Sequence, residues 1–272
     1  MKISAPCTKG ELKTGRFVIP YRIYENDGPH IICINGVQQS MAMWQTAVAR
    51  FSHDYRMVLF DFPNQGKAKI LSGSTQLSLD EQVGILAAVM EETGIKNDGT
   101  MCAASWGGVI SVGFASKYPD RIKRLILASL GTKPNKKMIE TIKNGATVDM
   151  NDRDKMAHTL IKSFGETLPP RIKQNIVSQF RSMKEESVQA FYEHGLFVIS
   201  QKSLGDVVDL KAIKARTILL NGENDTIIDL DDVKFLSTQI PNCELRILKD
   251  VGHFLHMERE DVLDIYEEIL RS

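Results

Sequence analysis

Short, almost continuous apolar runs recur along this chain and alternate with segments of helical spacing. Strands buried on both faces of a parallel sheet show such runs, and helices in the connections cover the two faces. The pattern therefore predicts an α/β protein with a mostly parallel sheet and helices on both sides. The runs are HIICING (30–36), YRMVLFDFP (55–63), GTMCAAS (99–105), IKRLILAS (122–129) and ARTILLNGEND (215–225).

The segments around these runs fit the same pattern. ELKTGRFVIPYRIYEND (11–27) predicts two strands joined at a Thr-Gly turn. Ser78 and Glu81 have the spacing of a capping box, so we expect a helix from there to about residue 95. A further strand is predicted within CELRILKDVGHF (243–254), and a helix over 260–271.

The interval from 132 to 214 breaks this alternation. It consists mostly of amphipathic helical segments, such as RIKQNIVSQFRSM (171–183), with few strand-like runs. We interpret it as a helical lid inserted between two sheet strands, over a site at the carboxyl ends of the strands. The predicted core domain then comprises residues 1–131 and 215–272, and the lid residues 132–214.

Composition excludes several functional classes. Lys plus Arg and Asp plus Glu both number 34, so no overall charge points to nucleic acid or to an anionic membrane. The start of the chain lacks the apolar core of a signal peptide, and no apolar run is long enough to span a membrane. The four cysteines are scattered without CxxC spacing, which favours reduced thiols and a cytoplasmic protein. No phosphate loop, dinucleotide fingerprint or metal-ligand cluster is evident, so no cofactor is expected.

Three polar residues follow predicted strands in an order typical of serine hydrolases. Ser105, Asp225 and His253 stand at the carboxyl ends of three strands, which meet at one edge of a parallel sheet. A serine hydroxyl becomes a good nucleophile when an imidazole takes its proton, and a carboxylate fixes the tautomer of that imidazole. The order Ser, Asp, His therefore predicts an acyl-transfer site on an α/β-hydrolase-like sheet.

The sequence around Ser105 departs from the usual G-x-S-x-G pattern of a nucleophile turn. Ala103 occupies the first glycine position, while Gly107 supplies the second and Gly108 follows it. Alanine is small enough for a sharp strand-to-helix turn, so we interpret Ser105 as the nucleophile. The alternative is a structural serine in a loop.

The acid and the base each have rivals nearby. Glu223 and Asp229 flank Asp225 and are either surface residues or the true acid. SLGT (129–132), where some proteins of this fold place the acid, has no carboxylate. His256 lies one helical turn after His253 and is expected at the surface or facing the lid. Three histidines without a strand-end context are expected to be structural: His30, His53 and His158.

Backbone N–H groups near Ser105 are expected to stabilise the negative oxygen of the reacting carbonyl. We assign these donors to Trp106, which follows the nucleophile, and to Val37, where Gly36 permits a tight turn. The Trp106 ring either walls the pocket or packs in the core. Gly36 and Asn35 are predicted at the substrate, although Asn35 is equally suited to forming the turn. His194, in the lid, is either structural, like His30, His53 and His158, or a further candidate for substrate contact.

With these residues in place, the chain resembles the α/β-hydrolase superfamily over its whole length. More narrowly it is similar to the hydroxyalkanoyloxyalkanoic acid synthases of rhamnolipid biosynthesis. The resemblance implies that Ser105 accepts a 3-hydroxyacyl group from an acyl carrier protein or coenzyme A thioester, and that the hydroxyl of a second 3-hydroxyacyl group attacks it. The matching segments are CINGV (33–37), VLFDFPNQG (58–66), ASWGG (104–108), LPPRIK (168–173), LNGEND (220–225) and GHFL (252–255).

Apolar and basic residues of the lid suggest how such a substrate binds. The apolar ones line an acyl pocket or form the lid's own core: Phe164, Ile176, Phe180, Met183, Phe191 and Phe197. A basic run is either a docking site for an acidic carrier protein or a solvated helix face: Lys133, Lys136, Lys137 and Lys143. Two other functions stay open, namely a carboxylesterase or thioesterase that uses water, and a non-catalytic ligand receptor on the same fold.

Overall fold

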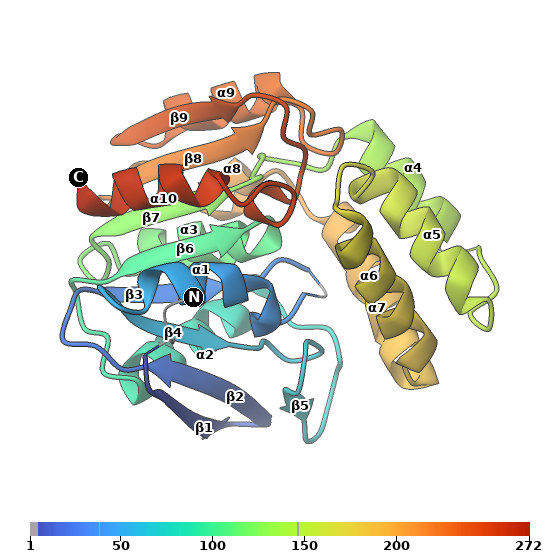
Figure 1. Cartoon of the computed structure of the whole chain (residues 1–272), viewed down its shortest axis with the longest axis horizontal. Coiled ribbons are helices and arrows are strands. Elements are labelled where there is room, and N and C mark those ends of the chain that lie inside the picture. The colour runs from blue at the N-terminus through green and yellow to red at the C-terminus, as the bar shows by residue number, and fades with distance from the viewer. Residues whose placement is uncertain (1–4, 38, 146) are drawn as a thin grey trace.

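A computed structural model describes residues 5–37, 39–145 and 147–272 of the chain. Nine strands within these ranges form one sheet, in the order β1-β2-β4-β3-β6-β7-β8-β9, with β5 paired to β2 (Figure 1). β2 pairs antiparallel with β1, β4 and β5, whereas the neighbours from β4 to β9 are all parallel. The predicted mostly parallel α/β architecture is thus confirmed. The strands are β1 (Cys7–Thr14), β2 (Phe17–Tyr24), β3 (His30–Ile34), β4 (Arg56–Phe60), β5 (Lys69–Ile70), β6 (Thr100–Ala104), β7 (Arg124–Ala128), β8 (Arg216–Gly222) and β9 (Cys243–Leu248).

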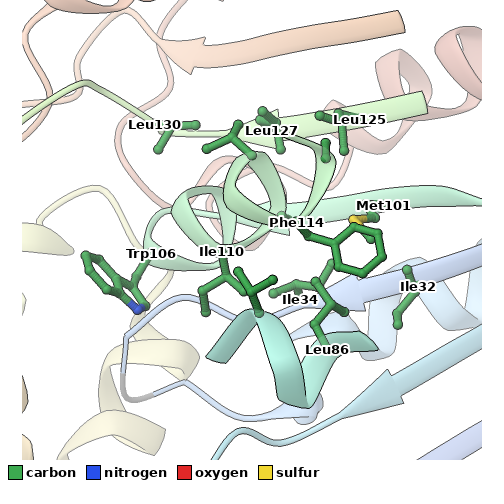
Figure 2. Close-up of a cluster of buried hydrophobic side chains, with 14 of the residues drawn as sticks. Ile32, Ile34, Leu86, Met101, Trp106, Ile110, Phe114, Leu125, Leu127 and Leu130 are labelled. Carbon is green, nitrogen blue, oxygen red and sulfur yellow. The ribbon is translucent and has the colours of Figure 1, made fainter. Parts of the chain in front are cut away.

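Helices cover both faces of the sheet. One face carries α2 (Leu79–Glu92), α3 (Trp106–Lys117) and α9 (Leu230–Gln239), whose apolar residues form one core cluster with the strands. Figure 2 shows part of this cluster, with α3 packed between α2 and β7. The other face carries η1 (Met41–Trp44), α1 (Gln45–Phe51) and α10 (Val262–Arg271), with a short turn, η3 (Leu255–Met257), before α10.

Strand β3 illustrates why the buried residues from Ile31 to Ile34 are all apolar. Successive side chains of a strand point to opposite faces. Ile32 and Ile34 accordingly pack on the α3 face, and Ile31 and Cys33 pack on the α1 face. A polar residue on either face would be buried without a partner, so the strand has no polar alternation.

Four helices stand beside the carboxyl ends of the parallel strands and are here called the lid helices (Figure 1). They are α4 (Lys136–Gly145), α5 (Arg153–Phe164), α6 (Pro170–Ser182) and α7 (Glu185–Ser200). Their distal parts share a small apolar core around Met156, Phe180 and Val188.

The segment after the lid helices packs differently from them. α8 (Leu204–Val207) and η2 (Leu210–Ala212) fall inside the range predicted for the lid. Leu204, Leu210 and Ile213 are nevertheless buried in the core cluster beneath α3. By packing, this segment belongs with the sheet domain, because its apolar side chains cover the sheet rather than the lid helices. No helix in the described ranges is long and apolar enough to cross a membrane.

Candidate active site

Ser105 stands at the sharp turn between β6 and α3. Its backbone angles are φ 49° and ψ −119°, a strained conformation for a residue with a side chain. The turn brings α3 so close to β3 that a Cβ on Gly107 would lie 2.5 Å from the carbonyl oxygen of Asn35 and 2.7 Å from that of Ile34. Ala103, which is fully buried, occupies the position where the common pattern has glycine. The local geometry is therefore that of a nucleophile elbow, and alanine fits it.

Asp225 and His253 are joined by a hydrogen bond at the ends of two neighbouring strands. His253 Nδ1 lies 2.8 Å from Asp225 Oδ2, and the carboxylate is fully buried. Asp225 Oδ1 accepts two backbone bonds, from the N–H of Ile227 at 2.9 Å and of Ile228 at 3.1 Å. With the carboxylate as acceptor, Nδ1 carries the ring proton, and Nε2 is left free to take a proton from a nucleophile.

The electrostatics of this pair favour a charged imidazole. Burial by itself raises the pKa of Asp225, but the charge and hydrogen bond of His253, with the two N–H donors, hold that pKa below its ordinary value. Burial lowers the pKa of His253, whereas Asp225, and to a smaller degree Glu258, raise it, and the result is a raised pKa. The site thus stabilises the imidazolium that forms when His253 accepts a proton.

A cavity of about 390 Å³ connects Ser105 and His253 to the lid. Gly36 and Val37 line the same cavity from the loop after β3. The first N–H groups of a helix have no partner within the helix, so the N–H of Trp106, at the start of α3, is available near the same point. No Asp, Glu, Lys or Arg is among the described residues that line the cavity. Its lining includes five methionines: Met43, Met138, Met156, Met183 and Met257.

Comparison with known proteins places this architecture. A family model of the α/β-hydrolase fold matches residues 29–260. The chain is an α/β-hydrolase. It is 23% identical over 250 residues to an (R)-3-hydroxydecanoyl-ACP:CoA transacylase of Pseudomonas putida. The matched region covers 90% of this chain and 84% of the relative. It is 22% identical over 256 residues to a monoacylglycerol lipase of Homo sapiens, covering 90% of this chain and 75% of that one.

Solved structures agree on the fold. An α/β-hydrolase from a deep-sea metagenome library superposes with a TM-score of 0.80 at 21% identity, over 95% of this chain and 97% of the other. The enol-lactonase of Burkholderia xenovorans LB400 gives a TM-score of 0.79 at 17% identity, over 97% and 100% of the two chains. Relatives of this α/β-hydrolase are named as hydrolases and transacylases, and the chain is an enzyme of that family.

Asn35 has a different role in this hydrolase from the predicted substrate contact. Its side chain is buried, with Nδ2 donating to the carbonyl of Phe60 at 3.0 Å and Oδ1 accepting from Trp44 Nε1 at 3.0 Å. These bonds tie the end of β3 to the end of β4 and to η1. The interpretation of Asn35 as a turn-forming residue is therefore the better one, because its polar atoms are already engaged inside the protein.

His194 and the ring of Trp106 lie together, away from the cavity at Ser105. The Trp106 ring packs edge-on against His194 and Phe197, and its Nε1 donates to Gln82 Oε1 at 2.8 Å. His194 lines a separate, much smaller pocket, and burial lowers its pKa to about 4. His194 therefore does not line the cavity at Ser105, and its packing fits the structural alternative. Core packing is the role of the Trp106 ring.

The lid residues predicted for an acyl pocket divide in the same way. Phe164, Ile176, Phe180, Met183 and Phe191 line the cavity, and Phe180 also belongs to the lid's own core. Phe197 instead packs on Trp106. One stripe of residues on α6 serves both purposes, since the cavity runs beside the lid core.

Supporting residues in the loop after β4 escaped the sequence analysis. Asp61 Oδ1 accepts from the N–H of Met41 at 2.7 Å, and Gln65 Nε2 donates to the carbonyl of Gly36 at 2.9 Å. Both residues are buried and hold the loop that carries Val37. They lie in VLFDFPNQG (58–66), a segment that resembles the corresponding segment of the hydroxyalkanoyloxyalkanoic acid synthases. The sequence signal that could have identified them is the presence of two polar residues directly after a buried strand.

Proposed function

We propose that this α/β-hydrolase transfers an acyl group through an ester on Ser105, and that the group is a 3-hydroxyacyl chain delivered as a neutral thioester. The observation that carries the proposal is the uncharged, apolar cavity that begins at Ser105 and His253 and extends along the lid helices. Burying an unpaired charge in such a cavity is costly, so the group that enters it is neutral.

The chemistry follows from the positions of the three polar residues. His253 Nε2 takes the proton of the Ser105 hydroxyl as its oxygen attacks the thioester carbonyl. The tetrahedral oxyanion accepts hydrogen bonds from the N–H groups of Val37 and Trp106. When the carbon–sulfur bond breaks, His253 returns the proton to the leaving sulfur, which departs as a thiol. A hydroxyl then attacks the acyl-serine, giving its proton to His253, and Ser105 is regenerated with the same proton.

The lid offers a binding site for a long acyl chain. Lining residues recur at helical spacing along α6, from Ile172 through Ile176 to Phe180, and Met183 follows just after the helix ends. The helical part of this stripe is about 12 Å long at 1.5 Å per residue. α5 contributes Leu160 and Phe164 to the same cavity. A chain attached to Ser105 is therefore expected to lie parallel to the lid helices, with its far end near Phe180.

Two further observations favour a carrier-bound 3-hydroxyacyl donor. The relatives from Pseudomonas are named as transacylases of (R)-3-hydroxydecanoyl-ACP. A basic group at the base of the lid also suits an acidic carrier protein: Lys133, Lys136, Lys137 and Lys143 are all exposed.

Product analysis tests the proposal. Purified protein is given a 3-hydroxydecanoyl thioester, beside a Ser105→Ala variant, and products are identified by mass spectrometry. The expected product is an ester of two hydroxy acids that the variant does not form. Free 3-hydroxy acid alone would show that water is the acceptor and that the protein is a thioesterase. Undiminished turnover by folded Ser105→Ala would refute the assignment of the nucleophile.

A further inference from the structure

We infer that Glu258 is a positioning residue for His253, assisted by Ser129, and that the two residues fix the backbone on both sides of the base. The inference rests on the proposed role of His253 in activating Ser105. Neither residue follows from the order Ser, Asp, His, and Ser129 lies in a segment, SLGT, that the sequence marks only by its lack of a carboxylate.

The Glu258 carboxylate binds the backbone N–H groups of the two residues on either side of His253. Oε2 accepts from the N–H of Gly252 at 2.7 Å, and Oε1 accepts from the N–H of Phe254 at 2.9 Å. Bonds from two backbone donors to a carboxylate are charge-assisted and stronger than neutral ones. One side chain therefore sets the path of the chain immediately before and immediately after the base.

Ser129 holds the remaining polar group of the same segment. Its Oγ donates to the carbonyl oxygen of His253 at 2.7 Å. Ser129 is buried at the end of β7, with φ 53°, and its N–H is bonded to the carbonyl of Leu220 at 2.8 Å. The sheet thus holds Ser129 at the end of β7, and Ser129 in turn holds the backbone of His253. β7 is the neighbour of β6, the strand that leads to Ser105. A base that must meet a hydroxyl within hydrogen-bond distance needs such support, since a small displacement greatly reduces the rate.

Glu258 has a second effect, through its charge. Two carboxylates act on His253, that of Asp225 from the loop after β8 and that of Glu258 from the turn after η3. Both favour the imidazolium. Removing the charge of Glu258 therefore lowers the pKa of His253, and the acid limb of the activity profile moves to lower pH. A residue that only stabilised the fold would leave that limb in place.

The test compares Glu258→Gln with Glu260→Gln, which removes an equal charge from an exposed side chain two residues along. The glutamine amide keeps one acceptor but turns an N–H₂ group toward the other backbone N–H. We expect kcat/KM for a p-nitrophenyl ester to fall roughly 10- to 100-fold, with the acid limb shifted to lower pH. Glu260→Gln should change neither. Wild-type kcat/KM and an unchanged limb in Glu258→Gln would overturn the inference.

Two additional variants separate positioning from folding. Glu258→Ala removes both acceptors, and added formate or acetate is expected to restore part of its activity. Failure of both ions to do so in a folded variant would contradict the positioning role of the Glu258 carboxylate. If the Glu258 variants do not fold, Ser129→Ala decides, since undiminished kcat/KM there overturns the inference. An inactive wild type, or an active Ser105→Ala, would instead refute the proposed function itself.

Discussion

Replacing Asp225 by asparagine tests the candidate base most directly. Asp225 Oδ1 is held by the N–H groups of Ile227 and Ile228, and Oδ2 faces Nδ1 of His253. An asparagine in this place keeps its oxygen on the two N–H donors, so its N–H₂ group points at Nδ1. Nδ1 must then accept, and the ring proton moves to Nε2. The base is present but cannot take the proton of Ser105.

The magnitude follows from that wrong tautomer. In a serine protease the equivalent change lowers kcat about 10⁴-fold, which is about 5 kcal/mol of transition-state stabilisation. We expect a loss of the same order here, with little change in the free energy of unfolding because the two backbone bonds are kept.

The pH profile supplies an independent reading of the same variant. The carboxylate raises the pKa of His253, and the proposed mechanism requires the imidazole to be neutral before it accepts a proton. Without the charge the pKa falls, so the acid limb of kcat/KM moves to lower pH. Stopped-flow or steady-state assays from pH 4 to 9 measure both effects, with Asp231→Asn, at an exposed side chain, as a control of equal charge. Residual activity above a tenth of wild type, or an unmoved acid limb, would refute the reasoning.

Two other substitutions test the cavity and the correction at Asn35. Phe180→Ala opens the far end of the acyl site, so the kcat/KM ratio of a tetradecanoyl to a decanoyl substrate should rise about tenfold; Phe197→Ala, outside the cavity, should leave that ratio unchanged. Asn35→Ala leaves Trp44 Nε1 and the carbonyl of Phe60 unpaired, and should lower the free energy of unfolding by about 1–3 kcal/mol for each group. Denaturant titration measures that loss, and a raised KM with unchanged stability would restore Asn35 as a substrate contact.

The sheet was predictable because burial on both faces leaves few choices of residue. Ile31 to Ile34 have no polar member for this reason, and most residues of the neighbouring strands β4, β6, β7 and β8 are also buried and apolar. The positions of Ser105, Asp225 and His253 follow from the same fact, since parallel strands bring their carboxyl ends to one edge. Strand ends can thus be located from sequence without knowing which strands are neighbours.

Side chains that form hydrogen bonds across irregular turns were not predictable in that way. Asn35 bonds to Trp44 and Phe60, and Glu258 bonds to Gly252 and Phe254, through turns whose shape no periodic pattern records. His194 was assigned to the substrate because it lies in the lid. Its ring instead faces Trp106, since the helical repeat does not reveal which side of α7 meets the sheet domain. Residues 204–207 and 210–212 are helical like the lid helices, and only their burial in the core of the sheet domain distinguishes them.

The lid is joined to the loops that carry the acid and the base, and this bears on whether water or an alcohol ends the reaction. Asn135, which caps α4, donates to the carbonyl of Thr226 at 3.1 Å and to Asp229 at 2.9 Å, just after Asp225. The turn after α5 lies against the base loop, where a Cβ on Gly165 would be 3.5 Å from the ring of Phe254. A lid displaced far enough to admit bulk water would break these contacts and disturb the loops of Asp225 and His253. With the lid in place, the proposed acyl-serine lies in an apolar cavity, where we expect an acceptor hydroxyl on an apolar chain to have an advantage that water lacks.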